Sequence, residues 1–335
     1  FKMNRTWWKE GVVYQIYPRS FKDSSGNGIG DIYGIIEKLD YIKSLGVNMI
    51  WICPIYSSPN DDNGYDISDY RKISEEFGGN RAFDILLKEM HKRDLKLIMD
   101  LVANHSSDEH RWFEESKKGE NNPYHDYYFW KKGKKEIRPN NWLSVFSGSV
   151  WEWDSNLNKY YLHSFTKKQP DLNWENPKVR DEIYDVLNFW FSKGVDGFRM
   201  DVISFISKRL DFPPAKPEAT LSEMMENIYA NGPRIHEYLK EMNEKVLSKY
   251  DIVTVGEGPG VNLKTGLNYV DEKEKELDMV FHFDHLQIDF GPEGKFDPQP
   301  IDFIKFKKVF SDWDSLLRNK GWNSIFLGNH DFSRI

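Results

Sequence analysis

Short apolar runs alternate with amphipathic helical stretches along this chain, and no other feature constrains its fold as strongly. The predicted strands are the apolar runs at residues 11–18, 47–53, 95–103, 195–202, 251–257, 278–283 and 322–329. The predicted helices have apolar residues at helical spacing and lie at 31–46, 81–94, 176–193, in a region ending near 249, and near 301–319. Such alternation predicts a parallel sheet, either doubly wound or closed into a barrel.

Two observations favour the barrel. No glycine-rich phosphate-binding fingerprint follows the first predicted strand, which disfavours a nucleotide-binding, doubly wound sheet. The length of 335 residues exceeds what one core normally serves unless the fold is a barrel or has several domains. We therefore predict an α/β fold of the TIM (β/α)8 barrel class. The chain stops just after the seventh predicted strand, where an eight-stranded barrel would have unpaired edges, so we expect a longer parent protein.

The alternation is interrupted once, after the third predicted strand. Residues 105–172 are rich in Trp, Tyr, Asn and charged residues and show weak periodicity, which predicts an inserted subdomain. Residues 1–104 then form the first part of the barrel and residues 173–335 the second part, without the last β/α unit or a C-terminal β-domain.

Charge and cysteine content narrow the classes of partner and the compartment. A net charge of −7 and a pI near 5.8 argue against nucleic acid and against anionic membrane surfaces. No apolar run approaches the roughly 20 residues that span a bilayer, and the first residues lack the apolar region of a signal peptide. The single cysteine, Cys53, fits a reducing compartment. We predict a cytoplasmic protein without nucleic-acid or membrane partners.

Chemically active side chains follow four of the predicted strands. In a β/α barrel the reaction takes place at the carboxyl ends of the strands. The residues at these ends are Asp100 and His105, Arg199 and Asp201, Glu257, and His330 and Asp331. Any one of these acids alone is best explained as a helix cap, but four strand ends of this kind together predict an active site.

Two carboxyl groups, one ionised and one protonated, are what the cleavage of a glycosidic bond requires. Arg199 lies two residues before Asp201 on one strand, so the two side chains share a face. A fixed cation favours the ionised form of Asp201, as a nucleophile needs. Glu257 has no basic neighbour within several residues of the sequence and is the better candidate for the proton donor.

Four segments in this order, "DLVANH", "GFRMDV", "GEGPG" and "GNHD", resemble the four signature regions of the α-amylase superfamily, glycoside hydrolase family 13. Two others, "QPDLNWENP" at 169–177 and "PNDDNGYDISDY" at 59–70, resemble its oligo-1,6-glucosidase and α-glucosidase branch. The resemblance extends over the whole chain.

The resemblance implies roles for individual residues. Asp201 matches the nucleophile, Glu257 the general acid/base, and Asp331 the third acid, which holds sugar hydroxyls in the transition state. The matching substrate-binding residues are His105, Arg199 and His330 around the −1 sugar, Asp62 and Tyr65 over the terminal glucose, and Phe146 and Phe165 as further lining. These roles imply an exo-acting, retaining α-glucosidase with a covalent glucosyl-enzyme intermediate, whose catalytic carboxyl groups are roughly 5–5.5 Å apart.

The linkage that such an enzyme cuts is a finer inference. In this branch the residue after the nucleophile tends to be Val in enzymes that cut α-1,6 bonds, and Ala or Thr in those that prefer α-1,4 bonds. Here it is Val202, which favours α-1,6 bonds of short oligosaccharides such as isomaltose, with α-1,4 as the alternative. Gly258 and the pair Phe332 and Ser333 depart from the usual residues at the rim, which leaves substrate size and linkage open.

The segment "DSSGNGIGD" at residues 23–31 begins like a calcium loop, with oxygen-bearing side chains at alternate positions. A calcium sensor would have Glu at the twelfth position, where this chain has Gly34, so switching is not expected. The resemblance implies one structural Ca²⁺, or Mg²⁺, held by Asp23, Ser25, Asn27, the Ile29 carbonyl and Asp31. The alternative is a glycine-rich turn without metal.

Two other functions remain as alternatives. A sucrose isomerase or other transglucosidase of the same branch shares the nucleophile and the acid but rejoins the cleaved sugars. Val202 argues against it, because the isomerases tend to have Thr there. A non-catalytic barrel relative would act as a binding partner, but such chains lose catalytic acids that are present here. We expect a small oligosaccharide as the partner and a monomer or weak oligomer.

Overall fold

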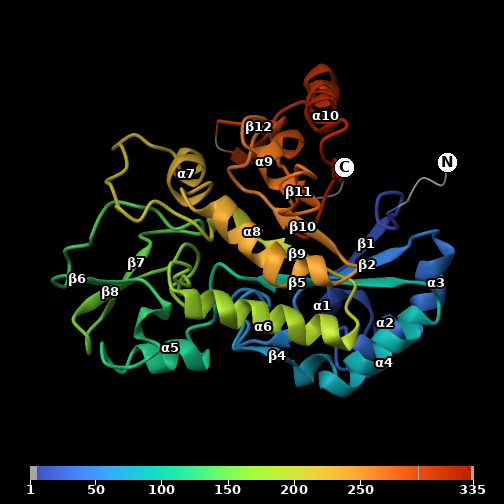
Figure 1. Cartoon of the computed structure of the whole chain (residues 1–335), viewed down its shortest axis with the longest axis horizontal. Coiled ribbons are helices and arrows are strands. Elements are labelled where there is room, and N and C mark those ends of the chain that lie inside the picture. The colour runs from blue at the N-terminus through green and yellow to red at the C-terminus, as the bar shows by residue number, and fades with distance from the viewer. Residues whose placement is uncertain (1–5, 293, 333–335) are drawn as a thin grey trace.

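A computed structural model describes residues 6–292 and 294–332 and contains one central parallel sheet (Figure 1). Its strands are β1 (Val13–Ile16), β2 (Met49–Ile52), β5 (Lys96–Val102), β9 (Gly197–Asp201), β10 (Val253–Glu257) and β11 (Met279–Phe281). The strand order in the sheet is β1-β2-β5-β9-β10-β11, and each strand is parallel to the next. A doubly wound sheet reverses its strand order at a switch point, whereas this order follows the chain, as in a β/α barrel.

Helices alternate with these strands along the chain, and the last helix follows β11. They are α1 (Pro18–Phe21), α2 (Ile32–Glu37), α3 (Leu39–Ser44), α4 (Gly79–His91), α6 (Pro177–Lys193), α7 (Leu221–Met224), α8 (Ile235–Lys245), α9 (Gly266–Val270) and α10 (Phe303–Leu317). Every residue of β2, β9 and β10 is buried, as expected for parallel strands that are covered on both faces.

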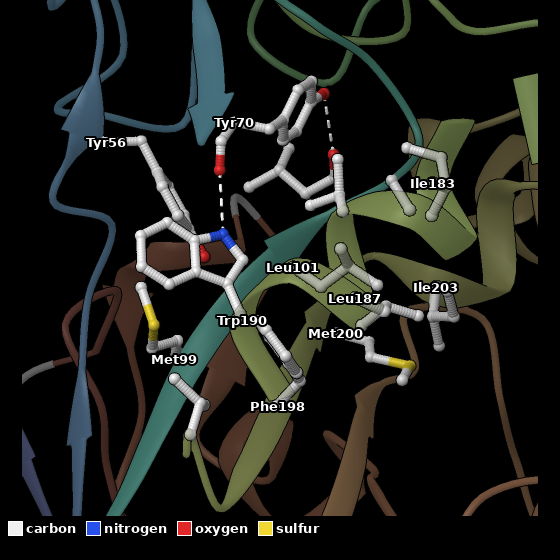
Figure 2. Packing of buried hydrophobic residues seen from close by; sticks show 14 of the residues in the cluster. Tyr56, Tyr70, Met99, Leu101, Ile183, Leu187, Trp190, Phe198, Met200 and Ile203 are labelled. Carbon is white, nitrogen blue, oxygen red and sulfur yellow. Dashed lines mark hydrogen bonds between the residues drawn. The ribbon is translucent and has the colours of Figure 1, made fainter. Parts of the chain in front are cut away.

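Helix α6 shows why the sequence forms these elements where it does. The Asn176 side chain caps its first turn by accepting a hydrogen bond from the Lys178 amide, and Pro177 occupies the first helical position. Gly194 ends the helix in the left-handed conformation, with φ 103°. Trp190 packs from this helix among side chains of β5 and β9, and its indole nitrogen donates a 2.8 Å hydrogen bond to the Tyr70 carbonyl (Figure 2).

Two predicted elements differ in the structure. The predicted helix at 31–46 is two helices, α2 and α3, that meet at Lys38, whose ψ of 2° is not helical. The predicted seventh strand at 322–329 was wrong, because this segment forms no strand in the described part of the chain. Phe326 instead packs its ring against Phe281 and His285, each with a centroid separation of 4.7 Å. The apolar character of residues 322–329 thus reflects packing against neighbouring rings and not pairing at a sheet edge.

Residues between β5 and α6 form a separate three-stranded antiparallel sheet, in the order β6 (Trp130–Lys132), β8 (Lys159–Leu162), β7 (Trp151–Asp154). Helix α5 (Arg111–Ser116) lies beside it (Figure 1). Isolated bridges between His105 and Asp171, and between Tyr128 and Leu172, join the segment that leaves the barrel to the one that returns. The three strands and α5 lie within residues 105–172, the segment predicted as an inserted subdomain.

Two hairpins complete the described structure: β3 (Tyr56–Ser57) with β4 (Asp69–Ile73), and β12 (Phe290–Gly291) with β13 (Gly294–Pro298). None of the helices in the described ranges is both long and apolar enough to cross a membrane.

Candidate active site

A cavity of about 760 Å³ lies at the carboxyl ends of the barrel strands. Its lining includes the predicted site residues Asp62, Tyr65, His105, Phe146, Phe165, Asp201, Glu257, His330 and Asp331. Arg199, the remaining predicted residue, is buried against two of these carboxyl groups. The structure therefore brings together side chains that are up to 269 positions apart, since 331 − 62 = 269.

Arg199 is at the centre of the charged groups. Its Nη1 lies 2.7 Å from Asp201 Oδ1 and 2.6 Å from Asp100 Oδ1, and its Nη2 lies 2.8 Å from Glu257 Oε2. The sheet register places Met200 opposite Gly256, so Asp201 and Glu257 follow directly on adjacent strands. Glu257 therefore lacks a basic neighbour along the sequence but contacts Arg199 in space.

The charges around Arg199 do not balance. Burial raises the pKa of Asp201, and the Arg199 guanidinium opposes this while the Glu257 carboxylate reinforces it. Burial likewise raises the pKa of Asp100 to about 6. One guanidinium contacts three buried carboxyl groups, and mutual repulsion among them favours retention of a proton by the cluster. An acid/base pair needs one protonated and one ionised carboxyl group.

His330 forms one wall of the cavity. Its ring stacks on Tyr65 with centroids 5.5 Å apart, and its Nε2 lies 3.0 Å from the Tyr65 hydroxyl. Its Nδ1 lies 2.9 Å from the Gln15 amide nitrogen. Burial, with the Arg199 charge, lowers the pKa of His330 to about 4. The imidazole is therefore neutral near pH 7 and acts there as a hydrogen-bonding group.

Gln169 connects two other predicted residues, Asp62 and His105. Its amide nitrogen donates a 2.8 Å hydrogen bond to Asp62 Oδ2 and lies 3.2 Å from His105 Nε2. Burial raises the pKa of Asp62 to about 7 and lowers that of His105 to about 4. Sequence reasoning did not identify Gln169 as a functional residue, although it is the first residue of the segment "QPDLNWENP".

Lys208 is a second residue that sequence reasoning missed. Its ammonium group is buried and contacts Asn104 Oδ1 at 2.7 Å, the Phe205 carbonyl at 2.6 Å and Asp171 Oδ2 at 3.1 Å. Burial lowers the pKa of Lys208, and the Asp171 carboxylate opposes that shift. This ammonium joins the end of β5, the end of the inserted segment and the turn after β9. A lone lysine in "ISKR" gives no sequence signal for this role.

Aromatic rings line the mouth of the cavity. Phe165 lies 5.0 Å from the His105 ring and 5.5 Å from the Phe146 ring, by centroid separation. Phe146 is 54% exposed and is the outermost of these rings. These rings give the mouth of the cavity an apolar surface.

The rim residues that depart from the usual pattern have different surroundings. A Cβ atom at Gly258 would lie only 2.8 Å from Val280 Cγ2 and 2.9 Å from Val261 Cγ2, so a larger residue has no room without movement. Phe332 lines the cavity beside Asp331, and Ser333 lies outside the described residues. Burial raises the pKa of Asp331, while Arg199 opposes the shift.

The loop at 23–31 is held by its own hydrogen bonds. Asp23 accepts from the amides of Ser25 at 2.9 Å, Gly26 at 2.7 Å and Gly28 at 2.7 Å. Asp31 accepts from the Gly34 amide at 2.7 Å and so caps α2. The donor set is purely oxygen, which suits a hard cation, and carboxylate oxygens that accept amide bonds keep lone pairs.

Oxygen atoms of this kind are those that Ca²⁺ and Mg²⁺ prefer. Nowhere in the described chain do three His, Cys, Asp or Glu side chains group as metal ligands. A cation here would therefore depend on the neutral oxygens of Ser25, Asn27 and the Ile29 carbonyl as well as on the two carboxylates.

Comparison with known proteins agrees with this geometry. The family described as alpha amylase, catalytic domain, matches residues 15–335. The oligo-1,6-glucosidase of Parageobacillus thermoglucosidasius is 59% identical over 333 residues, which cover 99% of this chain and 59% of that enzyme. Among solved structures, trehalose-6-phosphate hydrolase of Bacillus licheniformis is 50% identical with a TM-score of 0.93, covering 98% of this chain and 58% of the other.

The isomaltulose synthase of Klebsiella sp. LX3 is also 50% identical, with a TM-score of 0.94, and the match covers 98% of this chain and 59% of the synthase. The chain thus spans about three fifths of the length of these relatives. Nearly the whole chain is matched in every case. The chain belongs to the α-amylase family, glycoside hydrolase family 13, within its branch of oligo-1,6-glucosidases and α-glucosidases.

Proposed function

We propose that this protein is a retaining, exo-acting α-glucosidase that hydrolyses terminal α-1,6 bonds of short oligosaccharides such as isomaltose. The pairing of Asp201 and Glu257 on one buried guanidinium, in a cavity at the strand ends, carries this proposal. Relatives named oligo-1,6-glucosidase, at 54–59% identity, support the linkage.

The two carboxyl groups take different roles in this mechanism. Asp201 attacks the anomeric carbon while Glu257 protonates the glycosidic oxygen, so that the aglycone leaves and a covalent glucosyl-enzyme remains. Glu257 then removes a proton from water, which attacks the same carbon and releases glucose with its configuration retained. Arg199 contacts both carboxyl groups, and its charge favours the ionised form of Asp201 that the attack needs.

Hydrogen bonds among the residues around the cavity support an exo mode of action. Tyr65, His330 and Gln169 are joined to neighbouring side chains by hydrogen bonds, and Asp62 is held by Gln169. Such a bonded wall suits the hydroxyl groups of a terminal glucose, and Asp331, which also lines the cavity, is proposed to accept hydrogen bonds from them. The expected partner is therefore a small oligosaccharide. A cytoplasmic location, a monomeric or weakly associating state, and the lack of nucleic-acid and membrane partners stay predictions of the sequence.

The similarity to isomaltulose synthase supports a second candidate, a sucrose isomerase or transglucosidase. This enzyme would use the same first step but transfer glucose to a retained fructose instead of to water. Val202, which lines the cavity, argues for hydrolysis of α-1,6 bonds through the family pattern given above.

Rates of glucose release from isomaltose and maltose by the full-length protein test the proposed function. We expect kcat/KM to be higher for isomaltose, and Val202→Thr to lower the isomaltose-to-maltose ratio several-fold. Sucrose and trehalose 6-phosphate are the comparison substrates. Preferred conversion of sucrose to isomaltulose would favour the isomerase, and preferred cleavage of trehalose 6-phosphate would overturn the assigned substrate class.

We also propose that the loop at 23–31 binds one structural Ca²⁺ ion, or Mg²⁺. Millimolar Ca²⁺ should then raise Tm by about 2–4 °C, because an ion that binds only the folded state stabilises it. The double variant Ser25→Ala/Asn27→Ala keeps both carboxylates and should lose the Ca²⁺-dependent shift, while Asp40→Ala, on an exposed helix position, should keep it. Equal Tm values with Ca²⁺ and with chelator in the wild type would show a turn without metal.

A further inference from the structure

Val202, the residue after the predicted nucleophile, has an unusual backbone conformation. Its φ of 35° and ψ of 41° place it in the left-handed region. Of the ten described residues other than glycine that have positive φ, Val202 is the one β-branched residue and five are Asn. Left-handed β-branched residues are rare because the branched Cβ crowds the backbone, and such conformations cluster at functional sites.

This conformation turns the chain sharply at the end of β9. The chain leaves the strand at Asp201 and enters a short 3-10 turn, Ile203–Phe205, through Val202. At this point the Val202 amide donates a 2.9 Å hydrogen bond to Glu257 Oε2 on the adjacent strand. The backbone beside the nucleophile thus contacts the acid/base directly.

The surrounding structure holds this turn against β10. A Cβ atom at Gly256 would lie 2.8 Å from Ile203 Cγ2, so the glycine allows the close approach of the turn. The Ser204 hydroxyl donates a 2.8 Å hydrogen bond to the Pro259 carbonyl in the loop after Glu257. The Val202 side chain packs in a cluster with Phe205 and other buried residues. These contacts fix the amide relative to Glu257.

The two oxygens of Glu257 consequently differ. Oε2 accepts a hydrogen bond from the Val202 amide at 2.9 Å and forms an ion pair with Arg199 Nη2 at 2.8 Å. A proton on Oε2 would be opposed by the amide N–H dipole and by the guanidinium charge, so Oε2 carries no proton. Oε1 has no hydrogen-bond partner among the residues that the structure describes, and Glu257 lines the cavity. A proton on Glu257 therefore belongs on Oε1.

We infer that the Val202 backbone amide is a positioning group that keeps Oε2 of Glu257 unprotonated and so directs the acid proton to Oε1. The strained turn is the structural means, because it presents the amide to the adjacent strand. This inference rests on the proposed role of Glu257 as the acid/base. The role belongs to the backbone of residue 202, so it does not depend on how the side chain at this position contacts the substrate.

Replacing the amide at position 202 by an ester, with the valine side chain kept, removes only the N–H donor. Donation to a carboxylate stabilises it relative to its protonated form, and the ester lacks this donation. The alkaline limb of kcat/KM for isomaltose in the full-length protein should move up by about one pH unit. The matched control is an ester at Phe205, whose amide donates a 2.8 Å hydrogen bond to the Val202 carbonyl in the same turn. The control limb should stay at its wild-type pH.

The inference would be overturned if the alkaline limb of kcat/KM did not move in the ester at position 202. It would also be overturned if the ester at Phe205 moved the limb by the same amount. One further measurement applies even where an ester variant does not fold. A neutron structure on the acid side of the limb should show the deuteron on Oε1, and a deuteron on Oε2 would overturn the inference. Full activity of Glu257→Gln would instead refute the role of Glu257, and with it the proposed function.

Discussion

Asp201→Asn should lower kcat for isomaltose by at least about 10⁴-fold, because an amide oxygen cannot form the glucosyl-enzyme bond. The substitution is isosteric and keeps an acceptor for Arg199 Nη1, which lies 2.7 Å from Oδ1 in the wild type. Folding should therefore survive, and thermal melting checks that it does. Asp61→Asn is the matched control, since Asp61 is exposed and its carboxylate accepts from Thr166 at 2.6 Å; its kcat should stay close to the wild type.

Azide rescue separates the nucleophile from the acid/base. With an activated aryl α-glucoside, Asp201→Ala leaves room for azide on the face opposite the leaving group, so the product should be β-glucosyl azide. Glu257→Ala still forms the glucosyl-enzyme, and azide then attacks from the other face to give α-glucosyl azide. Reversed anomers would exchange the two roles, and the α-anomer from both variants would exclude Asp201 as the nucleophile.

The chemistry of this site could be predicted from the sequence because strand ends are local features. A buried parallel strand can be recognised in the sequence as an apolar run, and two such runs end at Asp201 and Glu257. Which carboxyl group Arg199 would contact depended on the register between strands. That register aligns Val255 with Arg199, and thereby places the cation beside Glu257 as well as Asp201.

Other contacts depended on segments that only the tertiary fold brings together. Gln169 reaches Asp62 across 107 positions, and Lys208 reaches Asn104 across 104. Neither residue type carries a local signal for a buried polar contact. The prediction of a strand at 322–329 was wrong for another reason. Apolar character alone cannot distinguish a strand from a segment without sheet pairing that packs its rings against a neighbour.

The second large effect concerns stability. Lys208→Met should reduce the free energy of unfolding by about 3–5 kcal/mol, because it leaves a buried carboxylate without its cation. The side chain of Lys208 is 1% exposed and that of Asp171 is 0% exposed, so water cannot replace the lost ammonium. Methionine has a similar length and fills the same volume, which separates the loss of charge from the loss of packing.

Two controls test whether the lower stability of Lys208→Met comes from the unpaired charge of Asp171. Lys308→Met removes an ion pair whose lysine side chain is 68% exposed and should leave the unfolding midpoint nearly unchanged. Adding Asp171→Asn to Lys208→Met removes the unpaired charge while the Ser164 amide, 2.9 Å from Asp171 Oδ1, still has an acceptor, so stability should partly recover. If the double variant were as unstable as the sum of the single ones, the ammonium would act through Asn104 and the Phe205 carbonyl instead. A wild-type midpoint for Lys208→Met would show that the buried cation contributes nothing to the join between the barrel and the inserted segment.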